Sequence, residues 1–149
     1  MITLLVVLGF VLMLGLTCIG SAIAVSNAGN ALIGGMRKNP DMFGKGLILC
    51  ALPSTQGLYG FAAFFLFLLQ LAEMSTLTYM QGVLIFASCA ALGFAGYISA
   101  LYQSKIVCNG ILEISNGRDV FGQSLILCVF PELYAILTFA ASFLVYAMA

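Results

Sequence analysis

The segment DMFGKGLILCALP at residues 41–53 recurs later in the chain as DVFGQSLILCVFP at residues 119–131. Aspartate, glycine, cysteine and proline recur in register, which a composition biased toward apolar residues would not produce by itself. Further along, more residues recur at the same offset: Phe61, Ala62, Ala63, Phe65 and Leu66. The chain therefore contains an internal duplication without gaps.

The composition indicates that lipid, not water, surrounds this chain. Of its 149 residues, 63% are hydrophobic and only 7% are charged, with five basic and five acidic side chains. A soluble domain carries about 25% charged residues. The balanced charge and the lack of a basic patch argue against a nucleic-acid partner. We expect an integral, all-α membrane protein.

Polar residues divide the chain into four apolar segments, expected at about 2–36, 42–70, 79–114 and 120–148. Each segment is longer than the ~20 residues that cross a bilayer, so each is predicted to be a transmembrane helix. The turn dipeptides Asn39-Pro40 and Asn116-Gly117 join the members of each pair. Because such dipeptides favour tight turns, the four helices are predicted to form two hairpins.

The two copies of the duplication correspond to the two hairpins, at residues 1–75 and 76–149. Each copy holds an even number of spans, so both copies run in the same direction, unlike the inverted repeats of many transporters. The first and third spans also carry rows of small residues, which let helix backbones approach closely in lipid. These rows are Gly20, Ala24, Ala28 and Ala31, and Ala87, Ala91, Ala95 and Ser99. Parallel repeats of this kind favour assembly into a ring with the first and third spans inside; the alternative is that the rows pack only within one hairpin.

The distribution of positive charge predicts the orientation. The basic residues near the first and third loops are Arg37, Lys38, Lys45 and Arg118. The middle loop carries only Glu73. The positive-inside rule therefore places loops 37–41 and 115–119 in the cytoplasm, and both termini and the middle loop outside. The expected location is the cell membrane, as a multi-pass protein.

The duplication breaks at one position that matters chemically. Ser54 of the first copy corresponds to Glu132 of the second, where the surrounding sequence CVFPELYAIL is apolar. A charge in mid-membrane costs several kcal/mol or more unless it is paired or neutralised, so such a glutamate is by default functional. The alternative is a neutral glutamate that only bonds a neighbouring helix.

Further polar residues are expected at the depth of Glu132. Gln103 and Glu132 lie almost equally far from the glycine of the second turn, one before it and the other after it. Thr55 and Gln56 lie at nearly the same separation from the asparagine of the first turn. At a rise of ~1.5 Å per residue, all four lie in one layer roughly 20–25 Å from the turns.

The oxygen donors of this layer suit a sodium ion. Four residues of the second span fall on one helical stripe: Leu52, Thr55, Gln56 and Tyr59. Pro53 and Pro131 lack a backbone donor, so both are expected to loosen their helices, and the first can free the carbonyl of Leu52. The predicted ligands are Leu52 (backbone carbonyl), Thr55, Gln56, Gln103 and Glu132. Hard cations prefer oxygen, and a monovalent ion balances one carboxylate, so we predict Na⁺, with H⁺ on Glu132 as the alternative. Tyr59 is predicted to orient the carboxylate by donating a hydrogen bond.

At these residues the sequence resembles the proteolipid (c or K) subunit of V-type ATPases, the rotor-ring subunit, and in particular its bacterial sodium-translocating members. The likeness covers nearly the whole chain and is most specific in LPSTQGLYGF at 52–61 and PELYAILTF at 131–139, together with Gln103. It implies that Glu132 carries the ion. It also implies the same Na⁺ ligands as above, with Tyr59 bonded to the glutamate. The chain departs from a sodium-binding member at Pro131, before the glutamate, and at Leu133, where that member has a polar residue.

The resemblance also implies partners. We expect a ring of identical copies in membrane lipid, turning against a stator membrane subunit whose arginine meets each Glu132 in turn. Central-stalk subunits are expected at loops 37–41 and 115–119, and ATP hydrolysis on other subunits. The chain has no GxxxxGK[ST] phosphate-binding motif, so it binds no nucleotide by that route. The resemblance implies a non-catalytic subunit, and we expect no organic cofactor.

Other classes of four-span protein fit less well. A small multidrug transporter also uses a membrane glutamate, but such proteins are shorter and carry it in the first span. A four-span enzyme acting on glutathione-like substrates would need several arginines near one membrane face, and this chain has only Arg37 and Arg118. A purely structural protein would leave the polar layer without a role. Purification separates these classes, since only a rotor protein predicts a large, detergent-resistant ring.

Overall fold

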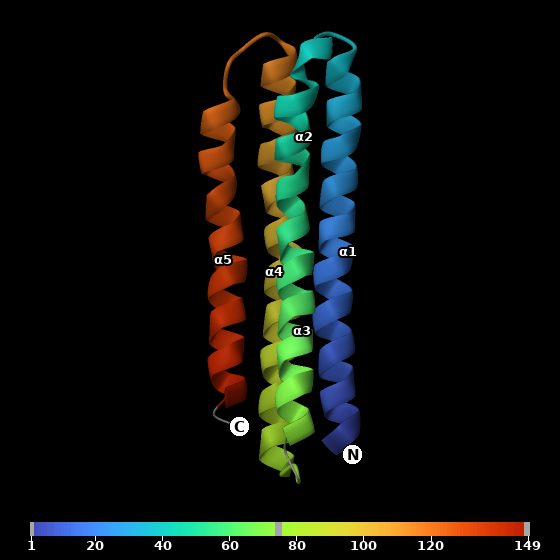
Figure 1. Ribbon diagram of the computed structural model, residues 1–149, viewed down its shortest axis with the longest axis vertical. Helices are drawn as coiled ribbons and strands as arrows, with labels where there is room; N and C mark the ends of the chain where they lie inside the picture. The colour runs from blue at the N-terminus through green and yellow to red at the C-terminus, as the bar shows by residue number, and fades with distance from the viewer. Residues whose placement is uncertain (1, 74–75, 148–149) are drawn as a thin grey trace.

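The computed structural model describes residues 2–73 and 76–147, and this part of the chain is an elongated bundle of helices (Figure 1). The helices are α1 (Ile2–Met36), α2 (Phe43–Ala51), α3 (Thr55–Glu73), α4 (Tyr79–Ser115) and α5 (Phe121–Ala147), with 3-10 turns at Pro40–Met42 and Leu52–Ser54. Among the described residues, four segments are long and apolar enough to cross a membrane: Ile2–Met36, Pro40–Ala72, Tyr79–Ser115 and Phe121–Val145. The prediction of an all-α protein with four spans is confirmed.

The first and third connections are tight turns at the same end of the bundle (Figure 1). After α4, Gly117 adopts a φ of +85°, a left-handed conformation that glycine adopts without steric cost. The N–H groups of Gly117 and Arg118 then cap the carbonyls of Ile114 and Glu113 at 3.0 and 3.1 Å. The two turns are tied together, because Lys45 Nζ lies 2.8 Å from Asp119 Oδ1.

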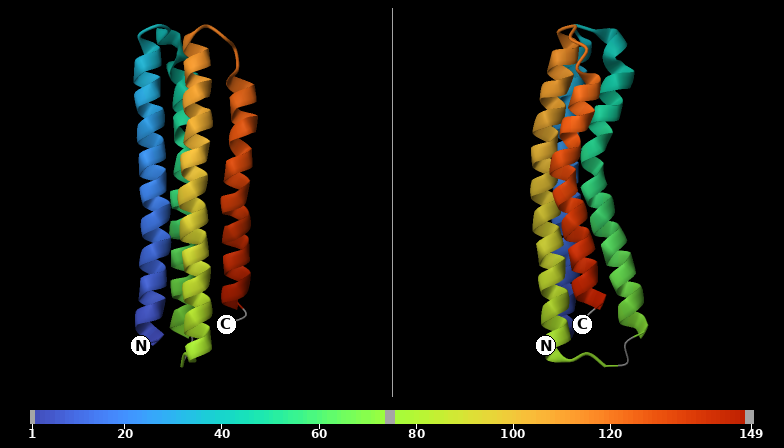
Figure 2. Two further views of the ribbon diagram at one scale, coloured as in Figure 1. Left: turned by 180° about the vertical axis from the view of Figure 1, so that it is seen from behind. Right: turned by 90° about the vertical axis from the view of Figure 1, so that its left-hand side faces the viewer.

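The closest helix pair is α1 with α4, which lie side by side along most of their length (Figure 2). A Cβ atom on Gly20 would lie 2.7 Å from Cα of Tyr97, so the two backbones leave no room for a side chain there. Ala24 and Ala28, in the same row of small residues, are fully buried. This row therefore packs against the second hairpin, and the alternative that it packs only within its own hairpin is wrong. The corresponding row on α4 is different, because Ala87 and Ala91 are exposed.

The remaining helices flank this pair, with α5 on α4 and α2–α3 on α1. Two apolar clusters fill the interior. The one toward the turns includes Ala28, Leu32, Leu49, Val107, Ile111 and Cys128, and the other includes Val6, Phe10, Met13, Phe67, Ile85 and Leu92. Between them along the chain lie buried polar side chains: Thr17, Ser21, Gln56, Ser99 and Gln103. The polar layer is thus enclosed by apolar packing at both ends.

The two prolines of the duplication behave differently. Pro53 has no N–H for the carbonyl of Leu49, which instead accepts the N–H of Leu52, so the backbone tightens into the 3-10 turn Leu52–Ser54. At Pro131 the α-helix continues without a break. The expectation that both prolines loosen their helices is therefore wrong at Pro131, and at Pro53 the α-helix is interrupted by a tighter turn in which the Leu52 carbonyl still accepts the N–H of Thr55. Near Pro131, side chains of α4 bond two carbonyls of α5, those of Pro131 and Cys128.

Candidate ion-binding site

The carboxylate of Glu132 on α5 is held from two other helices. The hydroxyl of Tyr59 on α3 donates a hydrogen bond of 2.6 Å to Oε1, and Nε2 of Gln103 on α4 donates one of 3.3 Å to Oε2. Glu132 itself is half-buried in the single chain. Because both oxygens accept hydrogen bonds, the arrangement fixes the direction in which the carboxylate points.

Two glutamines form the buried centre of the site. The side chains of Gln56 and Gln103 are completely inaccessible to solvent. Nε2 of Gln56 donates to Oε1 of Gln103 at 3.0 Å, and Nε2 of Gln103 also donates to the carbonyl of Cys128 at 3.0 Å. A buried amide is costly unless it is hydrogen-bonded, so these contacts are what allow two amides to lie inside an apolar bundle.

The last two predicted ligands, Leu52 and Thr55, lie in and directly after the 3-10 turn at Pro53. The hydroxyl of Thr55 donates to the carbonyl of Leu52 at 3.0 Å and lies 3.4 Å from Oε1 of Gln56. The backbone N–H of Thr55 bonds the same carbonyl. All the site residues singled out in the sequence are therefore joined in one network, which runs in the order Leu52, Thr55, Gln56, Gln103, Glu132 and Tyr59.

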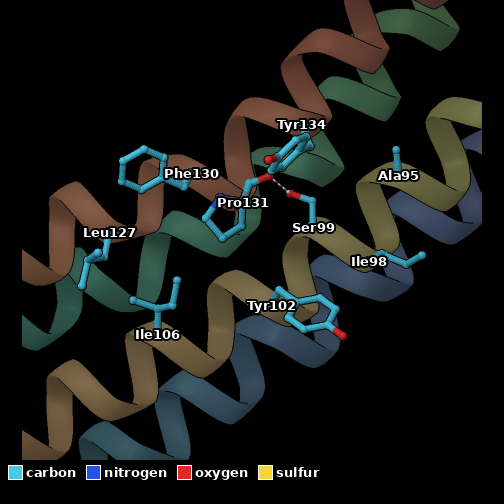
Figure 3. A pocket seen from close by; sticks show the side chains of 9 residues that line it. All are labelled: Ala95, Ile98, Ser99, Tyr102, Ile106, Leu127, Phe130, Pro131 and Tyr134. Carbon is cyan, nitrogen blue, oxygen red and sulfur yellow. Dashed lines mark hydrogen bonds between the residues drawn. The ribbon is translucent and has the colours of Figure 1, made fainter.

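Ser99 belongs to the network, although its sequence context indicated only a small residue for close helix packing. Its Oγ accepts a hydrogen bond of 3.1 Å from Gln56 and donates one of 2.7 Å to the carbonyl of Pro131 (Figure 3). Ser99 lies one helical turn before Gln103, so its place on the same face of α4 was a usable signal. Its hydroxyl links α3 to α5 across α4.

The chemistry of the network is that of hard oxygen atoms around a single charge. It offers the Glu132 carboxylate, the amide oxygens of Gln56 and Gln103, a hydroxyl and a backbone carbonyl. Within residues 2–73 and 76–147, no three His, Cys, Asp or Glu side chains come together. Oxygen donors with one negative charge match a monovalent hard cation better than a transition metal.

Comparison with known proteins shows the same duplication. The family of ATP synthase C subunits matches residues 8–67 and again residues 86–145. The second match is displaced from the first by the same offset that separates segment 119–131 from segment 41–53. The chain belongs to this family of ATP synthase C subunits.

Two curated relatives narrow the subfamily. The chain is 36% identical to the V-type sodium ATPase subunit K of Enterococcus hirae over 126 residues, which cover 85% of this chain and 80% of that protein. It is 32% identical to the A-type ATP synthase subunit K of Methanocaldococcus jannaschii over 125 residues, which cover 84% of this chain and 54% of that longer protein. The chain is thus a rotor proteolipid of the V/A type, a non-catalytic subunit that translocates ions. Proteins of this family form rings of identical copies within ATPase complexes.

Proposed function

We propose that this rotor proteolipid carries Na⁺ across the membrane on Glu132 as its ring rotates. The observation that carries the proposal is the continuous network of oxygen-bearing groups around one half-buried carboxylate. The relative from Enterococcus hirae, whose name specifies a sodium ATPase, supports the choice of ion. The proposed ligands are Glu132, Gln56, Gln103, Thr55 and the carbonyl of Leu52, with Tyr59 orienting the carboxylate.

Neutralisation is the physical basis of transport. A carboxylate in hydrocarbon costs about 3 kcal/mol even on permissive scales, so Glu132 faces lipid only when an ion or a proton cancels its charge. A bound Na⁺ cancels it and is itself surrounded by neutral oxygens. At the stator, an arginine takes over the pairing and the ion leaves. A bare charge never enters the lipid.

The arrangement at the turns supports the proposed orientation and partners. We place loops 37–41 and 115–119 in the cytoplasm because of their basic residues, with the termini and the middle loop outside. Between the two turns lies a polar hollow of about 210 Å³ whose walls include Asp41, Lys45 and Arg118. Such a charged surface, at the ends of the apolar spans, is suited to central-stalk subunits, which we place there.

The experiment that tests the proposal is carbodiimide labelling of Glu132 in the purified ring. The reagent modifies only a protonated carboxyl group, so a bound Na⁺ should protect Glu132. We expect Na⁺ but not K⁺ to slow the labelling, and Gln56→Ala or Gln103→Ala to abolish that protection. Gln123→Ala is the matched control, because Gln123 is exposed near the start of α5 and far along the helix from Glu132.

Repeating the labelling at several pH values gives a second, quantitative test. Where the free carboxyl group is protonated, each Na⁺ that binds displaces one proton, so the Na⁺ concentration for half-protection should rise about tenfold for each unit by which the pH falls. Labelling that ignores Na⁺ at every pH would contradict the sodium proposal and leave Glu132 as a proton carrier. A protein that purifies as a small oligomer and resists labelling would instead favour a transporter.

A further inference from the structure

A serine on α1 reaches the backbone of α3 directly after the proposed ligands of the second span. The hydroxyl of Ser21 accepts a hydrogen bond of 2.8 Å from the backbone N–H of Gly57. Ser21 is buried, with 7% of its surface accessible. Since Gly57 follows Gln56 in the sequence, this contact lies one residue beyond the last of those ligands.

The bond satisfies a backbone group that the interruption at Pro53 leaves without an acceptor. The first N–H groups of an α-helix have no carbonyl partner within that helix. Because α3 begins at Thr55, the N–H of Gly57 is one of these groups. Such a group is commonly bonded by the side-chain oxygen of the N-cap residue just before the helix. Here the oxygen comes from another helix, so Ser21 caps α3 from α1.

The hydroxyls beside the interruption bond other groups. Ser54 stands directly before α3, where an N-cap serine is expected, but its hydroxyl donates to the carbonyl of Ala51 at 2.6 Å. The hydroxyl of Thr55 donates to the carbonyl of Leu52 at 3.0 Å. Both hydroxyls thus bond carbonyls that precede α3, while the hydroxyl from α1 bonds the N–H of Gly57.

Two glycines on α3 give α1 access to this backbone. A Cβ atom on Gly57 would lie 3.2 Å from the hydroxyl oxygen of Ser21, which is tighter than nearly all contacts of such an atom. A Cβ atom on Gly60 would overlap the hydroxyl of Thr17, which is also on α1. The close contact of α1 with the start of α3 therefore depends on the absence of side chains at these two positions.

The second hairpin uses its equivalent serine in the opposite sense. Ser99 corresponds to Ser21, but its hydroxyl donates to the carbonyl of Pro131 at 2.7 Å. The two glycines are replaced there by Ala135 and Thr138, and α5 continues as an α-helix through its proline. The serine thus bonds a backbone acceptor where the helix is continuous, and a backbone donor where the helix is interrupted.

We propose that Ser21 is a positioning residue of the ion site, which caps α3 and thereby maintains the interruption at Pro53. The inference rests on the sodium proposal and deepens it. Without this acceptor, the N–H of Gly57 would bond the carbonyl of Pro53, four residues earlier, and extend α3 backward. Pro53 maintains the interruption because it lacks a donor, and Ser21 does so because it engages one.

The proposed ligands divide at the place where this cap acts. Leu52 belongs to the 3-10 turn, and Thr55 and Gln56 are the first two residues of α3. Gln103 and Glu132 lie on α4 and α5. A change at the start of α3 therefore moves one part of the ligand set relative to the other. Losing the cap should lower Na⁺ affinity without removing any ligand.

Ser21→Ala tests this role in the purified ring. It removes the acceptor and leaves a residue that favours the helix of α1. The Na⁺ concentration for half-protection of Glu132 from carbodiimide should rise about three- to tenfold, the effect of one hydrogen bond. Ser104→Ala is the matched control, because its buried hydroxyl donates to the carbonyl of Ala24 on α1 at 2.9 Å. This variant should dissociate at a lower temperature in detergent but keep the same half-protection.

A double-mutant cycle with Gly57→Ala separates the hydrogen bond from general packing. The new methyl group would press on the hydroxyl of Ser21, so Gly57→Ala alone should also raise the Na⁺ concentration for half-protection, although alanine favours a helix more than glycine does. Once Ser21→Ala has removed the hydroxyl, adding Gly57→Ala should change that concentration less than about twofold. Two effects that multiply in full would show independent positions and overturn the inference.

Hydrogen exchange reports on the cap in the absence of Na⁺. The backbone amide of Gly57 should exchange about three- to tenfold faster in the Ser21→Ala ring than in the unmodified ring. In Ser104→Ala its rate should stay the same. An unchanged rate in Ser21→Ala would contradict the cap. If Ser21→Ala does not assemble, Gly57→Ala carries the test, and unchanged half-protection in that variant would overturn the inference.

The outcomes distinguish this inference from the sodium proposal. If Na⁺ protects the unmodified ring and the Ser21→Ala ring at the same concentration, Ser21 has no positioning role and the sodium proposal stands. If Na⁺ protects neither ring, the sodium proposal fails, and the positioning role fails with it. Faster exchange at Gly57 in that case would leave Ser21 as a structural cap only.

Discussion

Tyr59 and Glu132, which are 73 residues apart in the chain, meet through a hydrogen bond of 2.6 Å between α3 and α5. The ring of Tyr59 also contacts Phe139 at a centroid distance of 6.2 Å. The phenol is thereby held from one side by packing while its hydroxyl holds the carboxylate. This pair links the two hairpins at the depth of the ion site.

Tyr59→Phe should weaken Na⁺ binding while leaving the ring assembled. The substitution keeps the packing against Phe139 but removes a hydrogen bond to a charged group, which contributes about 1.5–3 kcal/mol. The Na⁺ concentration for half-protection from carbodiimide should rise about 10- to 100-fold. Tyr134→Phe serves as the control, because the Tyr134 side chain is 68% exposed. The same Na⁺ concentration for half-protection in Tyr59→Phe and Tyr134→Phe would contradict an orienting role for Tyr59.

Replacing the two prolines should have unequal effects. In Pro53→Ala, a new N–H can bond the carbonyl of Leu49, so the 3-10 turn should relax to an α-helix. The Leu52 carbonyl would then accept the N–H of Gln56 instead of that of Thr55, which changes its direction. We expect Na⁺ affinity to fall about tenfold, or about 1.4 kcal/mol. The helix at Pro131 is already continuous, so Pro131→Ala should change the Na⁺ affinity less than about twofold. Isothermal titration with Na⁺ would check this, and the reverse order of effects would contradict it.

Ser99→Ala should lower both the stability of the ring and its affinity for Na⁺. The hydroxyl bonds Gln56 and the carbonyl of Pro131, and a buried group left without a partner costs about 1–3 kcal/mol. The temperature at which the ring dissociates in detergent should fall, and the Na⁺ concentration for half-protection should rise. Ser142→Ala is the matched control, since its hydroxyl bonds the carbonyl of Phe139 within α5. A shift in stability without any change in Na⁺ protection would limit Ser99 to a structural role.

Glu132→Gln should abolish transport without preventing assembly. Glutamine has the shape of glutamate and keeps an oxygen that can accept from Tyr59, but it cannot neutralise a cation. In vesicles that contain the complete ATPase, ATP-driven uptake of radioactive Na⁺ should fall to background, while the ring keeps its size. Measurable uptake in this variant would show that another group carries the ion.

Counting residues from the turns was sufficient to place the polar layer. Helices have a fixed rise per residue, and a tight turn sets the register of the two helices it joins. Gln56, Gln103 and Glu132 therefore lie together as expected. The small residue Gly20 likewise indicated a close helix contact, although not which helix would supply it.

The features that escaped prediction depend on partners far away in the chain. The motifs around Pro53 and Pro131 are nearly identical, yet only the first interrupts its α-helix. Ser99 was assigned to packing alone. Its place one turn before Gln103 indicates the shared face of α4, but not that its hydroxyl meets Gln56 on one side and Pro131 on the other. Such bonds follow from tertiary packing, which local pattern does not encode.

The serine at position 54 halves the number of proposed ion sites for a given number of hairpins in the ring. The first hairpin has Ser54 where the second has Glu132. With Glu132 as the proposed ion carrier, a full turn of a ring with a given number of hairpins therefore moves half as many ions as a ring with a carboxylate at this position in each hairpin. The work delivered in that turn is then divided among fewer ions. Each ion can be driven against about twice the electrochemical potential difference, at the expense of ions moved per ATP.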